Sequence, residues 1–267
     1  MMTIPFVKAS ACGNDFLLVN ESNVQTLGGR ADLADLTRRM CDRHNGVGAD
    51  GVEWMSPDTR GADLRIRLIN ADGSPAEISG NGTRCVAAWY VSEHGGERVR
   101  ILTDAGLKTC TLAARDGSLY EFETAMGEPQ VGDPFLIKLA FGEVTGIPVS
   151  MGNPHYVVFK DQFDIGWQAE AAEIGRHHDF KFGVNVEFVH VDDAHTISAR
   201  FFERGAGETQ SSGTGSSAAA VAAIAAGRVQ SPVTVRAPGG AQIVRWDGGE
   251  LFLRGPAHLI CRGEFLL

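Results

Sequence analysis

A short glycine-containing motif occurs twice in this chain, and it limits the possible folds more than any other feature. Ser79-Gly80-Asn81-Gly82-Thr83 precedes a predicted helix over Thr83–Val91, and Ser212-Gly213-Thr214-Gly215-Ser216 precedes one over Ser216–Ala226, which Gly227 ends. Glycine leaves the backbone N–H groups open to a ligand, and a helix N-terminus adds positive potential there. Two such termini facing each other would hold a carboxylate between them. The alternative is a pair of unrelated helix-capping turns.

The rest of the chain predicts strands around these two helices and a boundary between two halves. Turn-forming residues over Gly127–Pro134 place that boundary. The 267 residues agree with two domains or one large one. Apolar runs predict strands at Phe16–Val19, Leu64–Ile69, Val99–Leu102, Tyr156–Phe159, Val186–Val191 and Ile197–Phe202.

Composition excludes several classes of function. With 24 Lys+Arg against 33 Asp+Glu, the net charge of −9 argues against nucleic-acid or anionic-membrane partners, which need clustered basic residues. The longest apolar stretch, Ala218–Ala226, is far shorter than a membrane span, and the N-terminal residues do not resemble a signal peptide, so we expect a cytoplasmic protein. The five cysteines lack zinc-ligand spacing and predict reduced thiols and no metal site.

Six motifs in a fixed order carry a family resemblance. The chain closely resembles diaminopimelate epimerase, a pyridoxal-phosphate-independent amino-acid epimerase of lysine and peptidoglycan biosynthesis, from about Phe6 to Gly255-Pro256-Ala257. The motifs are Gly13-Asn14-Asp15-Phe16, Asp42-Arg43-His44 with Gly46-Val47-Gly48-Ala49-Asp50, Asn70-Ala71-Asp72-Gly73-Ser74, Gly80-Asn81-Gly82-Thr83-Arg84-Cys85, Met151-Gly152-Asn153-Pro154-His155 and Glu203-Arg204-Gly205-Ala206-Gly207-Glu208-Thr209.

The resemblance implies an α/β (α+β) fold of two pseudo-symmetric domains, each a curled, mostly antiparallel sheet around a central apolar helix. The expected domains are 1–125, completed by a returning last strand at about 254–267, and 126–253. It also implies a homodimer that needs no metal and no cofactor and acts on a small amino-acid substrate of the diaminopimelate type.

The implied reaction exchanges the α-proton between LL- and meso-diaminopimelate. One group removes the proton and another returns one on the opposite face, while the α-carboxylate takes up the carbanion charge. By resemblance, the backbone of Gly80, Asn81, Gly213 and Thr214 binds that carboxylate. The distal ammonium and carboxylate are assigned by resemblance to Asn14, Asn70, Asn153, Asn185 and Arg204, with Glu203 supplying acceptors; Arg204 can bind a carboxylate with two hydrogen bonds. Each asparagine alone is also a common turn residue.

The chain departs from the family at the two reacting groups. In the family one cysteine comes just before Gly-Asn-Gly and another just before Gly-Thr-Gly, whereas this chain has Ser79 and Ser212 at these positions. A thiol has a reference pKa near 8.5, but a serine hydroxyl ionises only beside a base. His155 and Glu203 match positions that tune the two cysteines, so either could act as the base directly. A related isomerase of phenazine biosynthesis shares the fold, lacks the cysteine pair and relies on acidic side chains. Cys85 matches a second, non-catalytic cysteine and is expected in the core.

A second departure leaves the substrate open. Gly51, followed by Val52 and Glu53, stands where the family commonly has glutamine. Besides the epimerase, three readings are compatible with the sequence: a racemase or isomerase of another amino acid using Ser79 and Ser212 with His155 and Glu203, a binding protein without catalysis, and an engineered Cys-to-Ser variant. The further serines at positions 211, 216 and 217 favour natural divergence over the last.

Overall fold

The computed structural model describes residues 2–25, 32–58, 61–140 and 142–267. The chain forms two compact units, Met1–Thr124 with Gly255–Leu267, and Ala125–Arg254. Each unit is described by itself below.

The first unit is a mostly antiparallel sheet with two parallel strand pairs, β2 with β3 and β4 with β6. The chain enters it at β1 and leaves it along β8, and the end of β18 returns to pair with β1. Its elements are β1 (Thr3–Ala11), β2 (Asn14–Asn20), α1 (Ser22–Gln25), α2 (Leu33–Cys41), β3 (Gly51–Ser56), β4 (Leu64–Asn70), β5 (Pro75–Ala76), α3 (Gly80–His94), β6 (Arg98–Thr103), β7 (Gly106–Asp116) and β8 (Leu119–Gly127).

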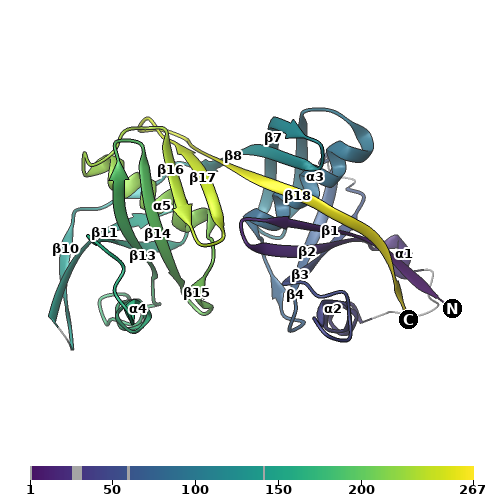
Figure 1. The fold of residues 1–267 in the computed structure, drawn as a ribbon, viewed down its shortest axis with the longest axis horizontal. Helices are drawn as coiled ribbons and strands as arrows, with labels where there is room; N and C mark the ends of the chain where they lie inside the picture. The colour runs from purple at the N-terminus through teal and green to yellow at the C-terminus, as the bar shows by residue number, and fades with distance from the viewer. Residues whose placement is uncertain (1, 26–31, 59–60, 141) are drawn as a thin grey trace. The chain divides into compact units, whose positions relative to one another are not determined.

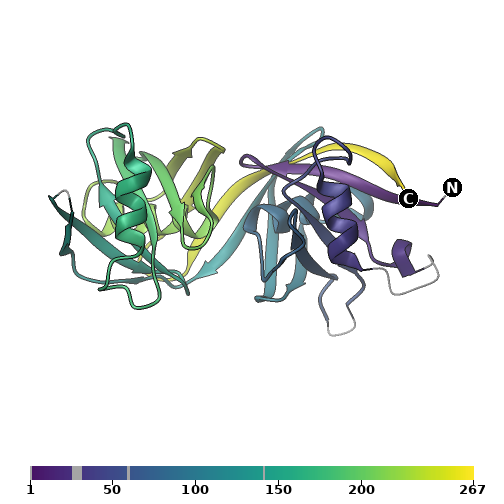
Figure 2. The same ribbon diagram turned by 90° about the horizontal axis from the view of Figure 1, so that it is seen from below.

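Two apolar clusters hold the first unit together. Helix α3 lies among the strands (Figure 1) and buries Cys85–Ala88 and Val91 against strand residues such as Leu68 and Phe122. Helix α2 lies against the strands of this unit (Figure 2), where Leu36 and Met40 pack with residues such as Trp54. Burial of these side chains, at about 25 cal/mol per Å², is the main force holding α3 in place.

The second unit repeats this plan. Parallel pairing again joins β12 with β13 and β14 with β16, and the remaining strand pairs are antiparallel. Its elements are β9 (Gln130–Val131), β10 (Phe135–Leu139), β11 (Gly142–Ser150), β12 (Pro154–Phe159), α4 (Trp167–Gly175), β13 (Asn185–Asp193), β14 (Thr196–Glu203), β15 (Gly207–Thr209), α5 (Gly213–Ala225), β16 (Val233–Ala237), β17 (Gly240–Arg245) and β18 (Leu251–Leu266).

Helix α5 is the central helix of the second unit. Ala218–Ala223 are all buried, and they pack against strand residues such as Val157 and Phe201. Helix α4 (Figure 2) covers a second cluster, where Ala171 and Ile174 meet Phe188. Alanine along α5 leaves room for strands to approach the helix closely on several sides.

The two units therefore share one order of elements. In each, an outer helix (α2 or α4) connects a parallel strand pair, and the central helix (α3 or α5) precedes the strand that forms the second parallel pair. The predicted fold, two pseudo-symmetric domains of curled sheet around an apolar helix, is confirmed. The two predicted helices and all six predicted strands are present, with α3 and α5 each beginning three residues earlier than expected, at the second residue of its motif.

Strand β18 is the segment that returns from the second unit to the first. Its residues Phe252–Arg254 pair with β17, and His258–Leu266 pair with β1, which brings the end of the chain next to Thr3 (Figure 1). Within the described part of the chain, no helix is both long enough and apolar enough to cross a lipid bilayer.

Candidate active site

The N-terminus of α3 is built by Ser79. This residue has extended backbone angles, and its Oγ accepts a hydrogen bond from the N–H of Gly82 at 3.1 Å. The Ser79 carbonyl accepts from the N–H of Thr83 at 2.8 Å. Ser79 is therefore the N-cap of α3, and Gly80 and Asn81 are the first two residues of its first turn.

The N-terminus of α5 has the same construction. Ser212 Oγ accepts from the N–H of Gly215 at 3.1 Å, and its carbonyl accepts from the N–H of Ser216 at 2.9 Å. Gly213 and Thr214 thus occupy the places that Gly80 and Asn81 have in the first unit. Both predicted motifs are capping turns, and the two turns have the same construction. Each one places the N–H groups of the first turn at the positive end of a buried helix, an arrangement that suits an anion.

A chain of hydrogen bonds fixes the asparagines beside α3. Asn81 Nδ2 donates to Asn14 Oδ1 at 2.8 Å, and Arg84 donates to Asn81 Oδ1. Arg84 is buried and also donates through Nε to the carbonyl of Pro256 at 3.2 Å. Asn14 and Asn81, both predicted site residues, are therefore in direct contact in the first unit.

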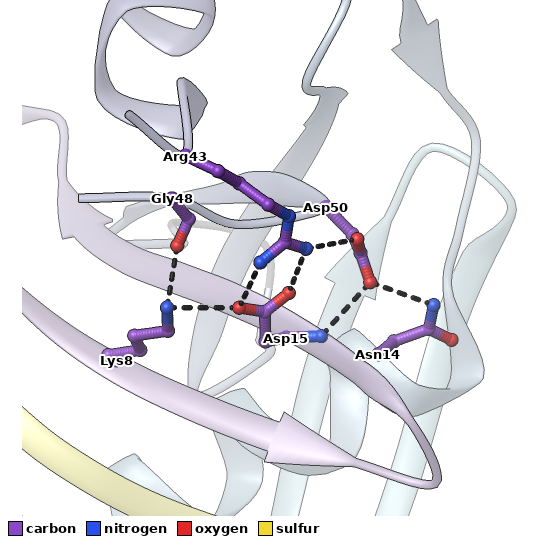
Figure 3. Close-up of polar contacts among 6 residues, drawn as sticks. All are labelled: Lys8, Asn14, Asp15, Arg43, Gly48 and Asp50. Atoms are coloured by element: carbon purple, nitrogen blue, oxygen red, sulfur yellow. Dashed lines mark hydrogen bonds and ion pairs between the residues drawn. The ribbon is translucent and has the colours of Figure 1, made fainter. Parts of the chain in front are cut away.

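Asn14 is held from its other side by a network of charged groups. Figure 3 shows Asp50 Oδ2 accepting from Asn14 Nδ2 at 3.0 Å and from the N–H of Asp15 at 3.1 Å, while Arg43 bridges the carboxylates of Asp15 and Asp50. Lys8 adds an ion pair to Asp15 at 3.0 Å and donates to the Gly48 carbonyl. Burial raises the pKa of Asp15, but hydrogen bonds from Arg43 and Lys8 outweigh it, so the net pKa is lowered. The Asp15 carboxylate therefore stays ionised, and Asp50 orients the Asn14 amide.

Asn70 stands apart from this chain of contacts. Its Nδ2 donates to Ser74 Oγ at 3.1 Å, and its backbone closes the turn at Gly73 and Ser74. It pairs with Gly51 across strands β4 and β3. The contacts of Asn70 are those of a turn residue.

In the second unit the structure brings His155, Asn153 and Thr214 together. His155 Nε2 lies 3.0 Å from Asn153 Oδ1, and Asn153 Nδ2 donates to Thr214 Oγ1 at 3.5 Å. His155 Nδ1 lies 2.7 Å from Oε1 of Glu187. Both ring nitrogens of this buried histidine are thus engaged by protein groups, and since a carbonyl oxygen only accepts, Nε2 donates to Asn153.

Asn185, Arg204 and Glu203 form a second group in this unit. Asn185 Oδ1 accepts from the N–H of Arg204 at 2.9 Å, and its Nδ2 donates to the carbonyl of Pro154. The Arg204 guanidinium is exposed and donates to the carbonyl of Phe182 at 3.1 Å. Glu203 accepts from Thr209 Oγ1 at 3.3 Å. The arginine is therefore placed by its backbone, and no ion pair neutralises its side chain within the described ranges.

Two buried glutamates were not among the predicted site residues. Glu53 and Glu187 are 0% and 1% exposed, and each lies in a strand beside the start of a central helix. Burial raises the pKa of Glu53 to about 8; burial also raises the pKa of Glu187, and the adjacent His155 offsets part of that rise. The available signal is a charged residue inside an apolar strand, present twice as Val52-Glu53-Trp54 and Val186-Glu187-Phe188.

The cysteines do not take the place of the two serines. Cys12, Cys41, Cys85 and Cys110 are buried and Cys261 is exposed. Cys85 lies in the cluster around α3, as expected, and burial raises its pKa. Among the described residues one group, His177, His178 and Asp179, offers three metal-ligand atoms within 4.8 Å of one another; it lies between α4 and β13, and His178 and Asp179 are exposed.

Comparison with known proteins decides the family. The family described as diaminopimelate epimerase matches residues 6–131 and 147–260. The chain belongs to the diaminopimelate epimerase family. Relatives named diaminopimelate epimerase include those of Pelotomaculum thermopropionicum, 37% identical over 97% of this chain and 98% of the relative, and Carboxydothermus hydrogenoformans, 34% identical over 98% and 99%.

Solved structures of differently named proteins share this fold. A phenazine biosynthesis protein of the PhzF family from Bacillus anthracis has a TM-score of 0.75 at 14% identity, covering all of both chains. A hydroxyproline epimerase from Agrobacterium vitis has a TM-score of 0.71 at 15% identity, covering 99% of this chain and 91% of that one. At these identities the likeness concerns the fold alone. As a member of the diaminopimelate epimerase family, the chain is an isomerase by descent.

Proposed function

We propose that this chain catalyses cofactor-independent proton transfer at the α-carbon of diaminopimelate, interconverting the LL and meso forms. The observation that carries the proposal is the pair of serine-capped helix N-termini, one in each unit of a chain that matches the diaminopimelate epimerase family over most of its length. Diaminopimelate carries an ammonium group and a carboxylate at its distal end as well, and the proposed site residues include partners for both kinds of group.

In this proposal the first-turn N–H groups of α3 and α5 bind the α-carboxylate. Gly80, Asn81, Gly213 and Thr214 supply them, and the charge that develops on that carboxylate after deprotonation is stabilised by the same donors. Because the donors are fixed by capped, buried helices, they need no rearrangement as the charge forms.

The remaining polar residues of the site bind the distal end of the substrate. Arg204 binds the second carboxylate with its exposed guanidinium, and Asn153 and Asn185 orient the contacts around it. Asn14 and Asn70 are assigned to the same end, and Glu203 accepts from the second ammonium group. Ser79 and Ser212 exchange the proton, with His155 and Glu203 as the titratable groups behind them.

Proton exchange tests this function directly. The purified protein is incubated with LL-diaminopimelate in deuterated water, and the α-proton is followed by NMR against a no-enzyme control and the variants Ser79→Ala and Ser212→Ala. We expect loss of the α-proton signal and appearance of the meso form with the parent protein only. A flat signal in the parent, with ligand-induced stabilisation in a thermal-shift assay, would show binding without chemistry on this substrate.

A second candidate is a racemase of another amino acid. Serine at both reacting positions and Gly51 in place of the family's common glutamine favour it. The same deuterium-exchange assay with a panel of amino acids separates the two, because this candidate requires exchange with another amino acid and none with diaminopimelate.

We further propose a homodimer in the cytoplasm. The family resemblance supports the dimer, and the acidic composition supports a soluble setting. Light scattering during size-exclusion chromatography measures the mass of the particle, and cell fractionation of the source organism locates the protein.

A further inference from the structure

Each unit buries one carboxyl group at an equivalent place. Glu53 is the third residue of β3 and pairs with Leu18 of the parallel strand β2. Glu187 is the third residue of β13 and pairs with Val157 of the parallel strand β12. The carboxyls are 0% and 1% exposed, although burying an acidic group is costly unless it is neutral or paired.

Both carboxyls lie against the second glycine of a motif. A Cβ built on Gly82 would lie 1.9 Å from Glu53 Oε1 and 3.3 Å from Ser79 Cβ. A Cβ built on Gly215 would lie 3.0 Å from Glu187 Oε1 and 2.9 Å from Ser212 Cβ. In each unit the capping serine and the buried carboxyl therefore approach the same point in the first turn of the central helix, and glycine is the residue that leaves room for both.

These carboxyls lack the hydrogen bonds that buried polar groups normally make. Within the described ranges, neither oxygen of Glu53 has a hydrogen-bond partner, and Oε2 of Glu187 has none. Buried polar groups in native proteins are nearly always bonded, so an unbonded one indicates a role that the resting structure does not show. A serine that must exchange protons requires a neighbouring acid or base, which is what these positions provide.

We propose that Glu53 and Glu187 are the proton partners of Ser79 and Ser212, each within its own unit, and that each serine hydroxyl passes a proton between the substrate α-carbon and the carboxyl beside it. This inference rests on the proposed function and names the groups that replace the acidity of the two missing thiols.

The proton and electron balance of the step is simple. Ser212 Oγ removes the α-proton while its own hydroxyl proton passes to Glu187; the C–H bond breaks and its electron pair moves into the α-carboxylate. Ser79 gives its hydroxyl proton to the opposite face of the α-carbon, which forms the new C–H bond, and takes the proton of Glu53. One proton has moved from Glu53 to Glu187, and turnover in the reverse direction or exchange with water restores the start.

The protonation states of the two carboxyls suit these roles. A pKa of about 8 keeps the proton on Glu53 at neutral pH, so this side begins as the acid. His155 donates from Nε2 to Asn153, and its short Nδ1 contact to Glu187 requires one proton between the two groups. His155 offsets part of the rise that burial causes in the pKa of Glu187, whereas no group offsets the rise at Glu53, so the Glu187 side begins as the base. His155 then acts through Glu187 as a positioning residue.

The relay needs a connection between the serine hydroxyl and the carboxyl. Ser79 Oγ accepts from Gly82 and no hydrogen bond links its hydroxyl to Glu53 in the structure. In the proposed relay, one bridging water or rotation of the serine side chain about χ1 makes this connection.

The decisive experiment replaces each glutamate by glutamine in three backgrounds: the parent, a variant with cysteine at the serine of the same unit, and a variant with cysteine at the serine of the other unit. In the exchange assay, Glu53→Gln should lower kcat at least about 100-fold with little change in KM, the size of a lost acid–base contribution. In a Ser79→Cys background the same change should cost less than about threefold, because a thiol with a pKa near 8.5 ionises without a partner carboxyl. Ser212→Cys should not rescue Glu53→Gln. Glu187→Gln should show the reverse pattern, with rescue by Ser212→Cys alone.

Glu170→Gln is the matched control for loss of a carboxyl. Glu170, in the first turn of α4, pairs with Lys160 at 2.7 Å, and its replacement should leave exchange unchanged. Equal loss of rate from Glu53→Gln in the serine and both cysteine backgrounds would show a purely structural role and overturn the proposal.

A second measurement does not depend on turnover. The infrared carboxyl band of Glu53, obtained as the difference between the parent and Glu53→Gln, should be that of a protonated acid at pH 7. It should shift in Ser79→Ala and stay in place in Ser212→Ala. If the Glu53 band has the same position in Ser79→Ala as in the parent, the proposed relay is overturned even in an active enzyme. If the parent exchanges no α-proton but the band shifts in Ser79→Ala, the proposed function is overturned and the relay stands.

Discussion

At the scale of single residues, Glu53 places an ionisable group where the fold offers its charge no partner. An unfolded glutamate ionises near pH 4.3, whereas burial raises the pKa of Glu53 in the folded protein to about 8. Between about pH 4.3 and 8, the folded state therefore keeps the Glu53 carboxyl protonated, whereas the unfolded chain loses this proton. The stability that protonated Glu53 contributes is complete below about pH 4 and is lost as pH rises through 8.

Glu53→Gln should remove this pH dependence. Between pH 5 and 8 we expect the free energy of unfolding of the parent to fall by about 1.4 kcal/mol per pH unit relative to the variant, which carries a neutral amide of the same shape. Urea unfolding at several pH values measures both proteins, and other titrating groups cancel in the difference. Parallel curves for the two proteins would mean that Glu53 is ionised throughout.

The carboxylate of Asp50 has a different use, because it orients a neighbour. It accepts from the Asn14 side chain and the Asp15 N–H and pairs with Arg43. Asp50→Ala should cost roughly 1–3 kcal/mol of stability and raise KM roughly fivefold or more, since Asn14 loses the bond that fixes its amide. Kinetics and unfolding of the same variant separate the two effects.

Asp35→Ala is the control for Asp50→Ala. Asp35 forms an exposed ion pair with Arg38 at 3.7 Å, and exposed pairs contribute little. KM should not change in this variant. An unchanged KM in Asp50→Ala as well would show that Asn14 takes no part in substrate binding.

At the scale of elements, the central helices begin under tight steric limits. Gly82→Ala would place a methyl 1.9 Å from Glu53 Oε1, whereas the nearest atom to a Cβ on Gly80 is 4.0 Å away, in the Arg84 guanidinium. We expect Gly82→Ala to destabilise the protein by about 1–3 kcal/mol through overpacking, and Gly80→Ala to change stability by less than about 0.5 kcal/mol.

Combining Gly82→Ala with Glu53→Ala tests the cause of that loss. The shorter side chain removes the clash, so the double variant should be less destabilised than the sum of the single variants. Thermal unfolding of the four proteins gives the coupling. Additive losses would place the strain in the helix backbone and not in the carboxyl.

The helices that the sequence predicted differ from those that it missed in the residues that mark their first turn. The starts of α3 and α5 follow from a capping serine and two glycines, all within five residues of the chain. Helix α4 begins after Gly166, which has a left-handed backbone and makes no side-chain cap, so the usual start signal is missing. Helix α2 does have a cap, Asp32, which accepts from the N–H groups of Ala34 and Asp35, and this signal was overlooked.

The candidate site was predictable to the extent that its motifs are contiguous. Ser79, Gly80 and Asn81 are neighbours in the chain, and so are Ser212, Gly213 and Thr214. The approach of Glu53 to Gly82 depends on how α3 packs against β3, and that of Glu187 to His155 depends on the pairing of β12 with β13. Local patterns carry no information about such pairs.

At the scale of the whole molecule, the chain is one plan built twice, and each copy retains the same three components: a serine cap, a second glycine and a buried glutamate. Drift that affected single residues at random would not be expected to keep serine and glutamate matched in both units. Proton transfer at a stereocentre needs one group for each face, so the duplication itself supplies both reacting groups. Activity should therefore depend on the two copies jointly.

Restoring both thiols tests this dependence. Ser79→Cys with Ser212→Cys should raise the α-proton exchange rate with diaminopimelate at least about tenfold over the parent, because a thiolate forms far more readily than an alkoxide. Ser216→Cys, at a buried serine bonded to Gln242, is the matched control and should give no gain. Each single cysteine should give less than the double variant, since the slower face then limits inversion. A folded double variant that binds diaminopimelate without exchanging its α-proton would show that the missing thiols are not what limits this chain, and its substrate would have to be sought elsewhere.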